Sequence, residues 1–173
     1  MGNTTHTTIT ERTVIGIDPG FDRLGWAVGR VEAGQKITTL GFGCITTDKK
    51  LALLERYAVL QEELEKILLM YQPTDAAIES LFFANNQKTV MQVSEARGII
   101  IANLLRQKIQ IGQYTPLQIK QAVTGFGRAD KIAVEKMVRL QLKITESHIL
   151  DDTMDALAIL ITHSTQLPIQ RLL

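Results

Sequence analysis

Residues 14–28, VIGIDPGFDRLGWAV, contain the pattern that decides the fold of this chain. The run Val14–Ile17 is mostly branched and apolar, which is typical of a strand buried on both faces. Asp18 ends this run, a Pro-Gly turn follows, and a second apolar stretch resumes at Leu24. The pattern therefore predicts a β-hairpin whose first strand lies deep in a sheet.

The carboxylate that ends this strand needs an explanation, because desolvating a lone charge is costly. Asp18 is expected either to cap the turn that follows it or to hold a cation. The stretch alone does not separate these two possibilities.

Length and composition indicate one globular domain. The chain has 173 residues, of which 45% are hydrophobic and 21% are charged, enough to bury a core. A single cysteine, Cys44, excludes an internal disulfide framework and a multi-cysteine zinc site, and its apolar surroundings favour a buried structural thiol. No apolar run reaches the roughly 18 residues of a membrane span. The first residues are polar, unlike a signal peptide, so we expect a cytoplasmic protein with no membrane partner. The expected parts are a flexible tail over 1–12, a domain over 13–165 and a C-terminal tail over 166–173.

The net charge of +1 conceals an uneven distribution. Residues 97–143 contain nine Lys or Arg against two acids, a local excess of +7, whereas residues 48–79 contain four against seven, or −3. A basic C-terminal half suits a polyanionic partner. Solvated helix faces would produce the same counts, so charge alone does not decide.

The order of apolar patterns predicts an α/β fold. Strands are expected over 36–46, 75–79 and 109–115, in addition to the first hairpin. Helices are expected for about 20 residues from Leu51, then over 88–107, from Pro116, over 129–142 and from Asp151. Three meander strands followed by two crossover strands make a five-stranded mixed sheet flanked by helices, in a single domain. Gly98 interrupts a helix, and close packing is expected to explain it.

Four acids stand where acids are unusual. Asp18 and Glu79 end two apolar strands, and Asp152 and Asp155 share one face at a helix start. Parallel neighbouring strands bring their carboxyl ends to one edge, where open α/β sheets place their sites. Clustered carboxylates select Mg²⁺ or Mn²⁺, and two such ions about 4 Å apart can promote phosphodiester hydrolysis.

Each of these acids also has a structural alternative. Asp151 or Asp152 can cap the last helix, and Glu79 can be a surface acid on an edge strand. The isolated histidines His6, His148 and His163 have no partner at metal-ligand spacing and are interpreted as surface or tail residues.

The motifs GIDPG, AIESLFFANNQKT, SEARG, TGFGRADK and DDTMDALA, in this order, resemble the RuvC family of Holliday-junction resolvases. The resemblance runs from about Val14 to His163. It implies an RNase H-like fold, a homodimer, and Mg²⁺-dependent symmetric nicking of a four-way DNA junction, leaving 5′-phosphate and 3′-hydroxyl ends. It also implies two Mg²⁺ ions per site, with Mn²⁺ as a substitute, and a branch-migration motor of the RuvA and RuvB type as partner. The four catalytic, metal-holding acids then fall on Asp18, Glu79, Asp152 and Asp155, where the family spacing D-x-x-D favours Asp152 over the adjacent Asp151 for the third role.

The same resemblance assigns residues to DNA contacts. Phe82 matches the aromatic residue that inserts at the junction, although Phe82 and Phe83 can also belong to the core. Gly125 and Gly127 are expected to bring backbone N–H groups close to phosphate. A solvated surface is the alternative for each lysine. The full predicted DNA-binding set is Phe82, Asn86, Lys88, Thr89, Lys120, Gly125, Gly127, Arg128 and Lys131.

Three rival functions follow from the same residues. An actin-like ATPase also begins with a strand, an aspartate and a hairpin, but it needs two such domains. A related RNA-processing nuclease lacks the FFANNQKT loop. A junction-binding scaffold without catalysis is disfavoured because all four acids are present.

Overall fold

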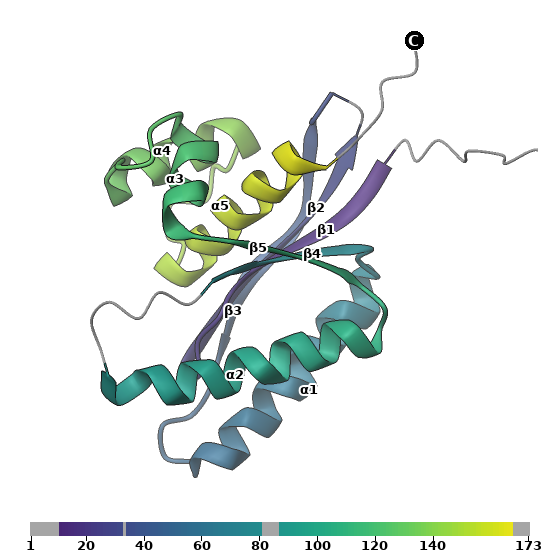
Figure 1. Cartoon of the computed structure of the whole chain (residues 1–173), viewed down its shortest axis with the longest axis vertical. Coiled ribbons are helices and arrows are strands. Elements are labelled where there is room, and N and C mark those ends of the chain that lie inside the picture. Colours follow the sequence, from purple (N-terminus) through teal and green to yellow (C-terminus); the bar gives the residue numbers. More distant parts are fainter. Residues whose placement is uncertain (1–10, 33, 81–86, 168–173) are drawn as a thin grey trace, which may run out of the picture.

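The computed structural model describes residues 11–32, 34–80 and 87–167 of the chain (Figure 1). Its elements are β1 (Glu11–Asp18), β2 (Arg23–Glu32), β3 (Ile37–Thr46), α1 (Leu53–Tyr71), β4 (Asp75–Glu79), α2 (Gln87–Arg106), β5 (Gln110–Tyr114), α3 (Pro116–Thr124), α4 (Lys131–Leu142) and α5 (Asp151–Gln166). Among these residues, none of the helices combines the length and apolar character that a membrane crossing needs.

The five strands form one mixed sheet in the order β3-β2-β1-β4-β5. β1 pairs antiparallel with β2 and parallel with β4, and β5 continues the parallel half. β1 is thus the central strand, which confirms the predicted five-stranded mixed sheet. The predicted tails lie mostly outside the described residues, so those boundaries remain predictions.

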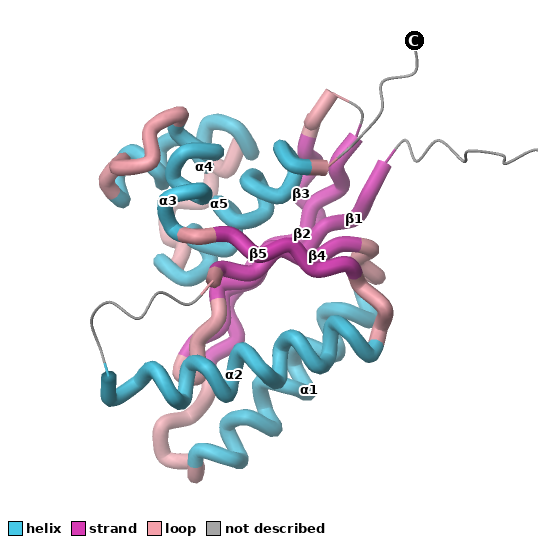
Figure 2. Tube along the Cα trace, viewed as in Figure 1, coloured by secondary structure: helices cyan, strands magenta, loops and turns pink. Residues whose placement is uncertain are grey.

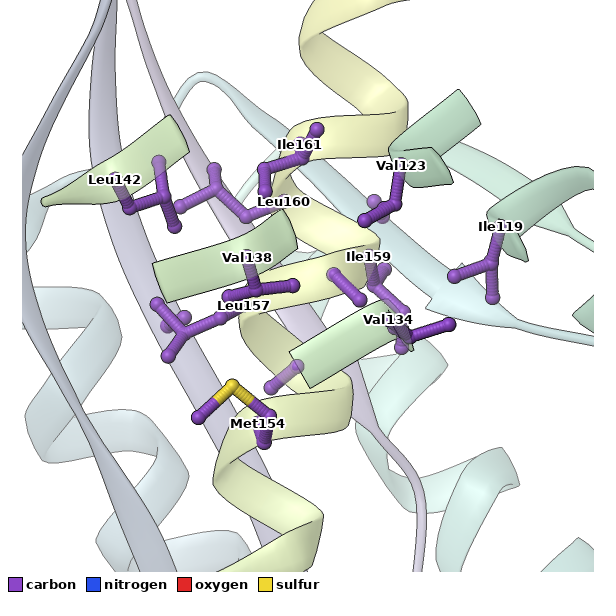
Figure 3. Close-up of a cluster of buried hydrophobic side chains, with 14 of the residues drawn as sticks. Ile119, Val123, Val134, Val138, Leu142, Met154, Leu157, Ile159, Leu160 and Ile161 are labelled. Carbon is purple, nitrogen blue, oxygen red and sulfur yellow. The ribbon is translucent and has the colours of Figure 1, made fainter. Parts of the chain in front are cut away.

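Helices cover both faces of the sheet (Figures 1 and 2). α1 and α2 lie on one face, and α5 lies on the other with α3 and α4 outside it. Alternate residues of each strand serve the two layers: Ile15 and Ile17 pack towards α1 and α2, whereas Val14 packs in the cluster around α5. Figure 3 shows this second cluster, in which Leu157 and Leu160 of α5 lie close to Val138 and Leu142 of α4.

Two glycines let α5 lie directly on the sheet. A Cβ atom on Gly16 would overlap the backbone oxygen of Ala156, and one on Gly25 would overlap the backbone oxygen of Asp152. Interiors are close-packed, so neither backbone has room to withdraw at small cost. The helix backbone therefore runs against β1 and β2, which fixes the position of its first turn.

The prediction for His163 is wrong. This residue is 7% exposed, and its Nδ1 lies 2.8 Å from the Tyr114 hydroxyl, while its Nε2 lies 3.8 Å from an oxygen of the buried Asp75. Its spacing from Ile159 and Leu160 places it on the buried face of α5, a signal that sequence reasoning overlooked. His148 is exposed as expected, and His6 lies outside the described residues.

Two further expectations change. Gly98 is exposed, and a Cβ atom there would meet no atom of the described residues within 4 Å, so packing inside the chain does not explain it. The thiol of Cys44 is only partly buried, although burial still raises its pKa.

Candidate active site

Asp18 and Glu79 lie side by side at one edge of the sheet. Ile17 and Ile78 are partners in the parallel β1–β4 ladder, and the two acids follow them at the carboxyl ends of these strands. By the alternation of side chains, both acids share the face covered by α5. Both remain partly exposed, so neither is sealed from solvent.

Asp152 and Asp155 reach the same edge from the start of α5. Gly25, which pairs with Asp18 across the β1–β2 ladder, lies against the backbone of Asp152. This contact brings the first turn of α5 beside the end of β1. Three segments that are far apart in the sequence thus supply the four acids.

The electrostatics show that these carboxyl groups interact. Burial is the largest cause that raises the pKa of Asp18, and together with the charges of Asp155, Glu79 and Asp152 it brings this pKa to about 8, while Lys131 opposes them. Burial and Asp155 likewise raise the pKa of Glu79 to about 6, against the effect of Lys120. Burial is also the largest cause of the raised pKa of Asp155. A divalent cation would offset this repulsion.

Cationic side chains from this chain contact the acids. Arg23 Nε lies 2.9 Å from Asp152 Oδ2. Lys131 Nζ lies 3.1 Å from Asp151 Oδ2 and 3.6 Å from Asp155 Oδ2. Arg23 was not predicted, because no sequence spacing relates the first residue of β2 to the distant start of α5.

The structure also decides between roles for Asp151 and Asp152. α5 begins after Leu150, which makes no side-chain capping bond, so the helix-cap alternative for either aspartate is wrong. The Asp151 side chain is 74% exposed and paired with Lys131, whereas that of Asp152 is 20% exposed. Asp152 is therefore the member of this pair that joins the acidic group.

The donor set fits a hard divalent metal ion. Among residues 11–32, 34–80 and 87–167, no three acids, histidines or cysteines stand close enough to enclose an ion. Like charges repel one another, and Arg23 and Lys131 pair with Asp152 and Asp155. Asp152 Oδ2 is buried without a hydrogen bond of proper geometry, despite the nearby Arg23. An orphaned carboxylate oxygen beside further carboxylates suits Mg²⁺ or Mn²⁺.

A hollow of about 220 Å³ opens beside the acids. Glu79 and Asp155 line one part of it, Lys120 and Lys131 line another, and the remaining wall is apolar and comes from α3, α4 and α5. Both predicted lysines therefore lie next to the carboxylates. Cations at this distance suit a phosphate group that approaches the acids.

The other predicted DNA-binding residues have different positions. Thr89 lines a separate groove that also contains Asp152, and Arg128 is exposed in the turn before α4. Phe82, Asn86 and the alternative core residue Phe83 lie outside the described residues, as does the side chain of Lys88.

The expectation for the two glycines is wrong in its mechanism. The Gly125 N–H is donated to the Gln121 carbonyl, and the Gly127 N–H to the Gln121 side chain, at 2.9 Å each. Gly125 has a positive φ of 78° and ends α3, which is the reason for a glycine there. Sequence reasoning missed Phe126 between them, whose side chain is 61% exposed at the tip of this turn.

Two carboxylates at the ends of adjacent strands, opposed by lysines and joined by a pair of acids from a helix, define this protein as an RNase H-like nuclease. The family model for "Crossover junction endodeoxyribonuclease RuvC" matches residues 14–163. The chain belongs to this RuvC family, which confirms the resemblance seen in the sequence.

Similar proteins agree with this assignment. The crossover junction endodeoxyribonuclease RuvC of Finegoldia magna is 44% identical over 150 residues, covering 87% of this chain and 91% of that protein. The RuvC of Caldicellulosiruptor saccharolyticus is 41% identical over 150 residues, covering 87% and 90%. The structure of Thermus thermophilus RuvC in complex with a Holliday junction substrate superposes with a TM-score of 0.83 at 31% identity, covering 88% of this chain and 93% of that one.

Proposed function

We propose that this protein resolves four-way DNA junctions by metal-dependent hydrolysis of a phosphodiester bond in each of two strands, in recombination and repair. The observation that supports this most directly is the convergence of the four acids, seen in the pKa of Asp18, which three of the other carboxylates raise. Membership of the RuvC family supplies the substrate class, and the junction complex of the Thermus thermophilus relative agrees with it.

The metal proposed is Mg²⁺, two ions per site, with Mn²⁺ as a substitute. Asp18, Glu79, Asp152 and Asp155 would hold it through oxygen donors. Bound there, it would supply an activated water and stabilise the leaving oxygen.

The chain's own cations would position the DNA. Lys120 and Lys131 face the carboxylates from α3 and α4 and would bind the phosphate that is cut. Arg128 would bind a phosphate further along the strand. For Phe82, Asn86, Lys88 and Thr89 we propose the junction-facing roles that the family resemblance implies, including stacking of Phe82 on an unpaired base.

We further propose that the active form is a homodimer, because paired nicks need two sites. Exposed residues recur along one face of α2 at steps of four, three, four and three, namely Met91, Glu95, Gly98, Ala102 and Leu105. Met91 and Leu105 are 71% and 62% exposed. A second copy of α2 lying on this stripe would bury both and would explain Gly98, since a glycine allows two helices to approach closely.

Two other expectations remain predictions. A RuvA- and RuvB-type motor as partner follows from the family resemblance, and a cytoplasmic location follows from the polar first residues and the lack of a long apolar run in the sequence. The rival functions, an actin-like ATPase and an RNA-processing nuclease, are not favoured by the family assignment.

Cleavage of a synthetic four-way DNA junction tests the function. The wild-type protein should cut with Mg²⁺ and should not cut in EDTA. Asp18→Asn should abolish cutting while retaining junction binding, because the amide keeps the shape of the side chain but loses the charge that would hold the metal.

The matched control is Glu62→Gln, an equally neutralising change at an exposed position of α1, which should cut at the wild-type rate. Cleavage by Asp18→Asn at that rate would refute the proposed metal site. Preferential cutting of structured RNA would favour the RNA-processing alternative.

A further inference from the structure

A second groove, of about 540 Å³, borders the acidic site at Asp152. It is lined by Gly20 of the β1–β2 turn, by Arg23 at the start of β2, by Lys49 after β3, and by Thr89 near the start of α2. We call it the turn groove. Glu79 and Asp155 of the acidic site line the hollow described above, and Asp152 lines the turn groove. A DNA strand that runs from one to the other would therefore cross the carboxylates.

A buried arginine holds the turn groove in shape. Arg56 of α1, whose side chain is 9% exposed, donates from Nε to Thr47 Oγ1 at 2.9 Å and from Nη2 to the Phe21 carbonyl at 3.2 Å. Its guanidinium also lies 5.0 Å from the centre of the Phe21 ring and pairs with Asp22. These contacts fix the backbone of the turn that directly follows Asp18.

The groove has a surplus of positive charge, because Arg56 neutralises the acid of the turn. The hydrogen bond with Arg56 lowers the pKa of Asp22, so Asp22 is ionised and its charge cancels that of Arg56. The Lys49 side chain is 79% exposed, and its Nζ lies 3.7 Å from Asp22 Oδ2. Because Asp22 is already paired with Arg56, the charge of Lys49 is not neutralised. A surplus cation at a groove wall is suited to an anion from solution.

Arg23 has donors to spare as well. Its side chain is 49% exposed, and its contact with Asp152 is an ion pair without hydrogen-bond geometry. Its guanidinium donates no hydrogen bond to any described residue, although a guanidinium carries five N–H donors. A planar guanidinium that is exposed and has free N–H donors is suited to bind phosphate oxygens.

We propose that the turn groove binds the DNA backbone beside the scissile phosphate, with Arg23 and Lys49 each contacting a phosphate that is not cut. This inference rests on the proposed function, because it assumes a DNA strand over the acids. The first hollow has Lys120 and Lys131 beside Glu79 and Asp155, and the turn groove has Arg23 and Lys49 beside Asp152. Together they would hold the strand at two points.

Salt-dependent binding of a fluorescent four-way junction, measured by anisotropy in EDTA, tests this assignment without catalysis. Each phosphate contact that is lost makes the slope of log K against log salt less steep by about 0.9. We expect this change for Arg23→Gln and for Lys49→Gln, and about twice the change for the double variant. Lys50→Gln is the matched control, because Lys50 is exposed next to Lys49 but does not line the groove.

A purely structural role for Arg23, as counterion of Asp152, is tested in an Asp152→Asn background. If Arg23 contacts phosphate, adding Arg23→Gln to the Asp152→Asn protein still makes the salt slope less steep. Adding Arg23→Lys instead keeps most of the slope. If Arg23 only neutralises Asp152, the protein that carries both Asp152→Asn and Arg23→Gln binds the junction like Asp152→Asn alone, and the assignment is overturned. An unchanged salt slope for Lys49→Gln would overturn it as well. A wild-type protein that fails to bind the junction would instead refute the proposed function itself.

Discussion

At the scale of single residues, Asp18 shows how the site stores unfavourable energy. It ends strand β1, in which Ile15 and Ile17 are completely buried, so its carboxyl group is largely desolvated. The charges of three other carboxylates also act on it. Both effects disfavour the charged form. The fold therefore holds this carboxyl where ionisation is costly unless a cation is bound, an arrangement that is common at functional sites.

This cost has a definite pH dependence. The pKa of Asp18 is raised from 3.8 to about 8 in the folded chain. The stabilisation that comes from the neutral form is fully present below pH ~4 and is lost as pH rises through ~8. In EDTA, Asp18→Asn should raise the free energy of unfolding at pH 9 by on the order of 2 kcal/mol, and by less at pH 5.

Urea denaturation at the two pH values measures this difference. Glu62→Gln, on the solvent side of α1, serves as control and should change the stability little at either pH. Equal unfolding free energies for Asp18→Asn and wild type at pH 9 would show that this carboxyl ionises normally.

At the scale of elements, the position of α5 depends on the glycines beneath it. Gly25 lies against the backbone of Asp152, with no room for a Cβ atom. An added methyl group must displace the start of α5, and with it both aspartates of the site. A shift of about 1 Å is enough to reduce catalysis strongly.

Gly25→Ala should therefore lower the junction-cleavage rate by at least about 100-fold and destabilise the fold by about 1–3 kcal/mol. Gly29→Ala is the matched control in the same strand, because its Cβ atom would meet only side-chain methyl groups of Ile37 and Leu160, at 3.0 Å. Single-turnover cleavage and thermal unfolding of both variants measure the two effects. A fully active Gly25→Ala protein would show that α5 adjusts without moving the acids.

At the scale of the whole molecule, the stripe on α2 predicts how two copies associate. Leu105→Asp should weaken dimer formation by at least about tenfold, or 1.4 kcal/mol, because it places an unpaired charge in an apolar contact. Sedimentation equilibrium measures the change.

Met70→Asp is the control for this prediction, since Met70 is 74% exposed but belongs to α1. It should leave the association unchanged. Equal dimerisation of both variants would place the contact on another surface, and a wild-type protein that remains monomeric at all concentrations would contradict the proposed homodimer.

Local patterns predicted most of the architecture. The alternation and length of the apolar runs gave the five strands, and Pro116 marked the start of α3 as the structure has it. The errors arose where a residue's neighbours come from elsewhere in the fold. His163 is buried by Tyr114 and Asp75, and the N–H groups of two glycines are taken by Gln121.

The sequence by itself determined the family and the five strands, and it predicted the four acids of the site, because motifs and hydrophobic periodicity are local properties. Only the tertiary structure decided which aspartate of the pair at 151 and 152 turns inward, that Arg23 pairs with it, and that Arg56 holds the turn after Asp18. These facts depend on how closely α5 and α1 pack against the sheet. Such packing is set by contacts between distant segments, which no spacing along the chain encodes.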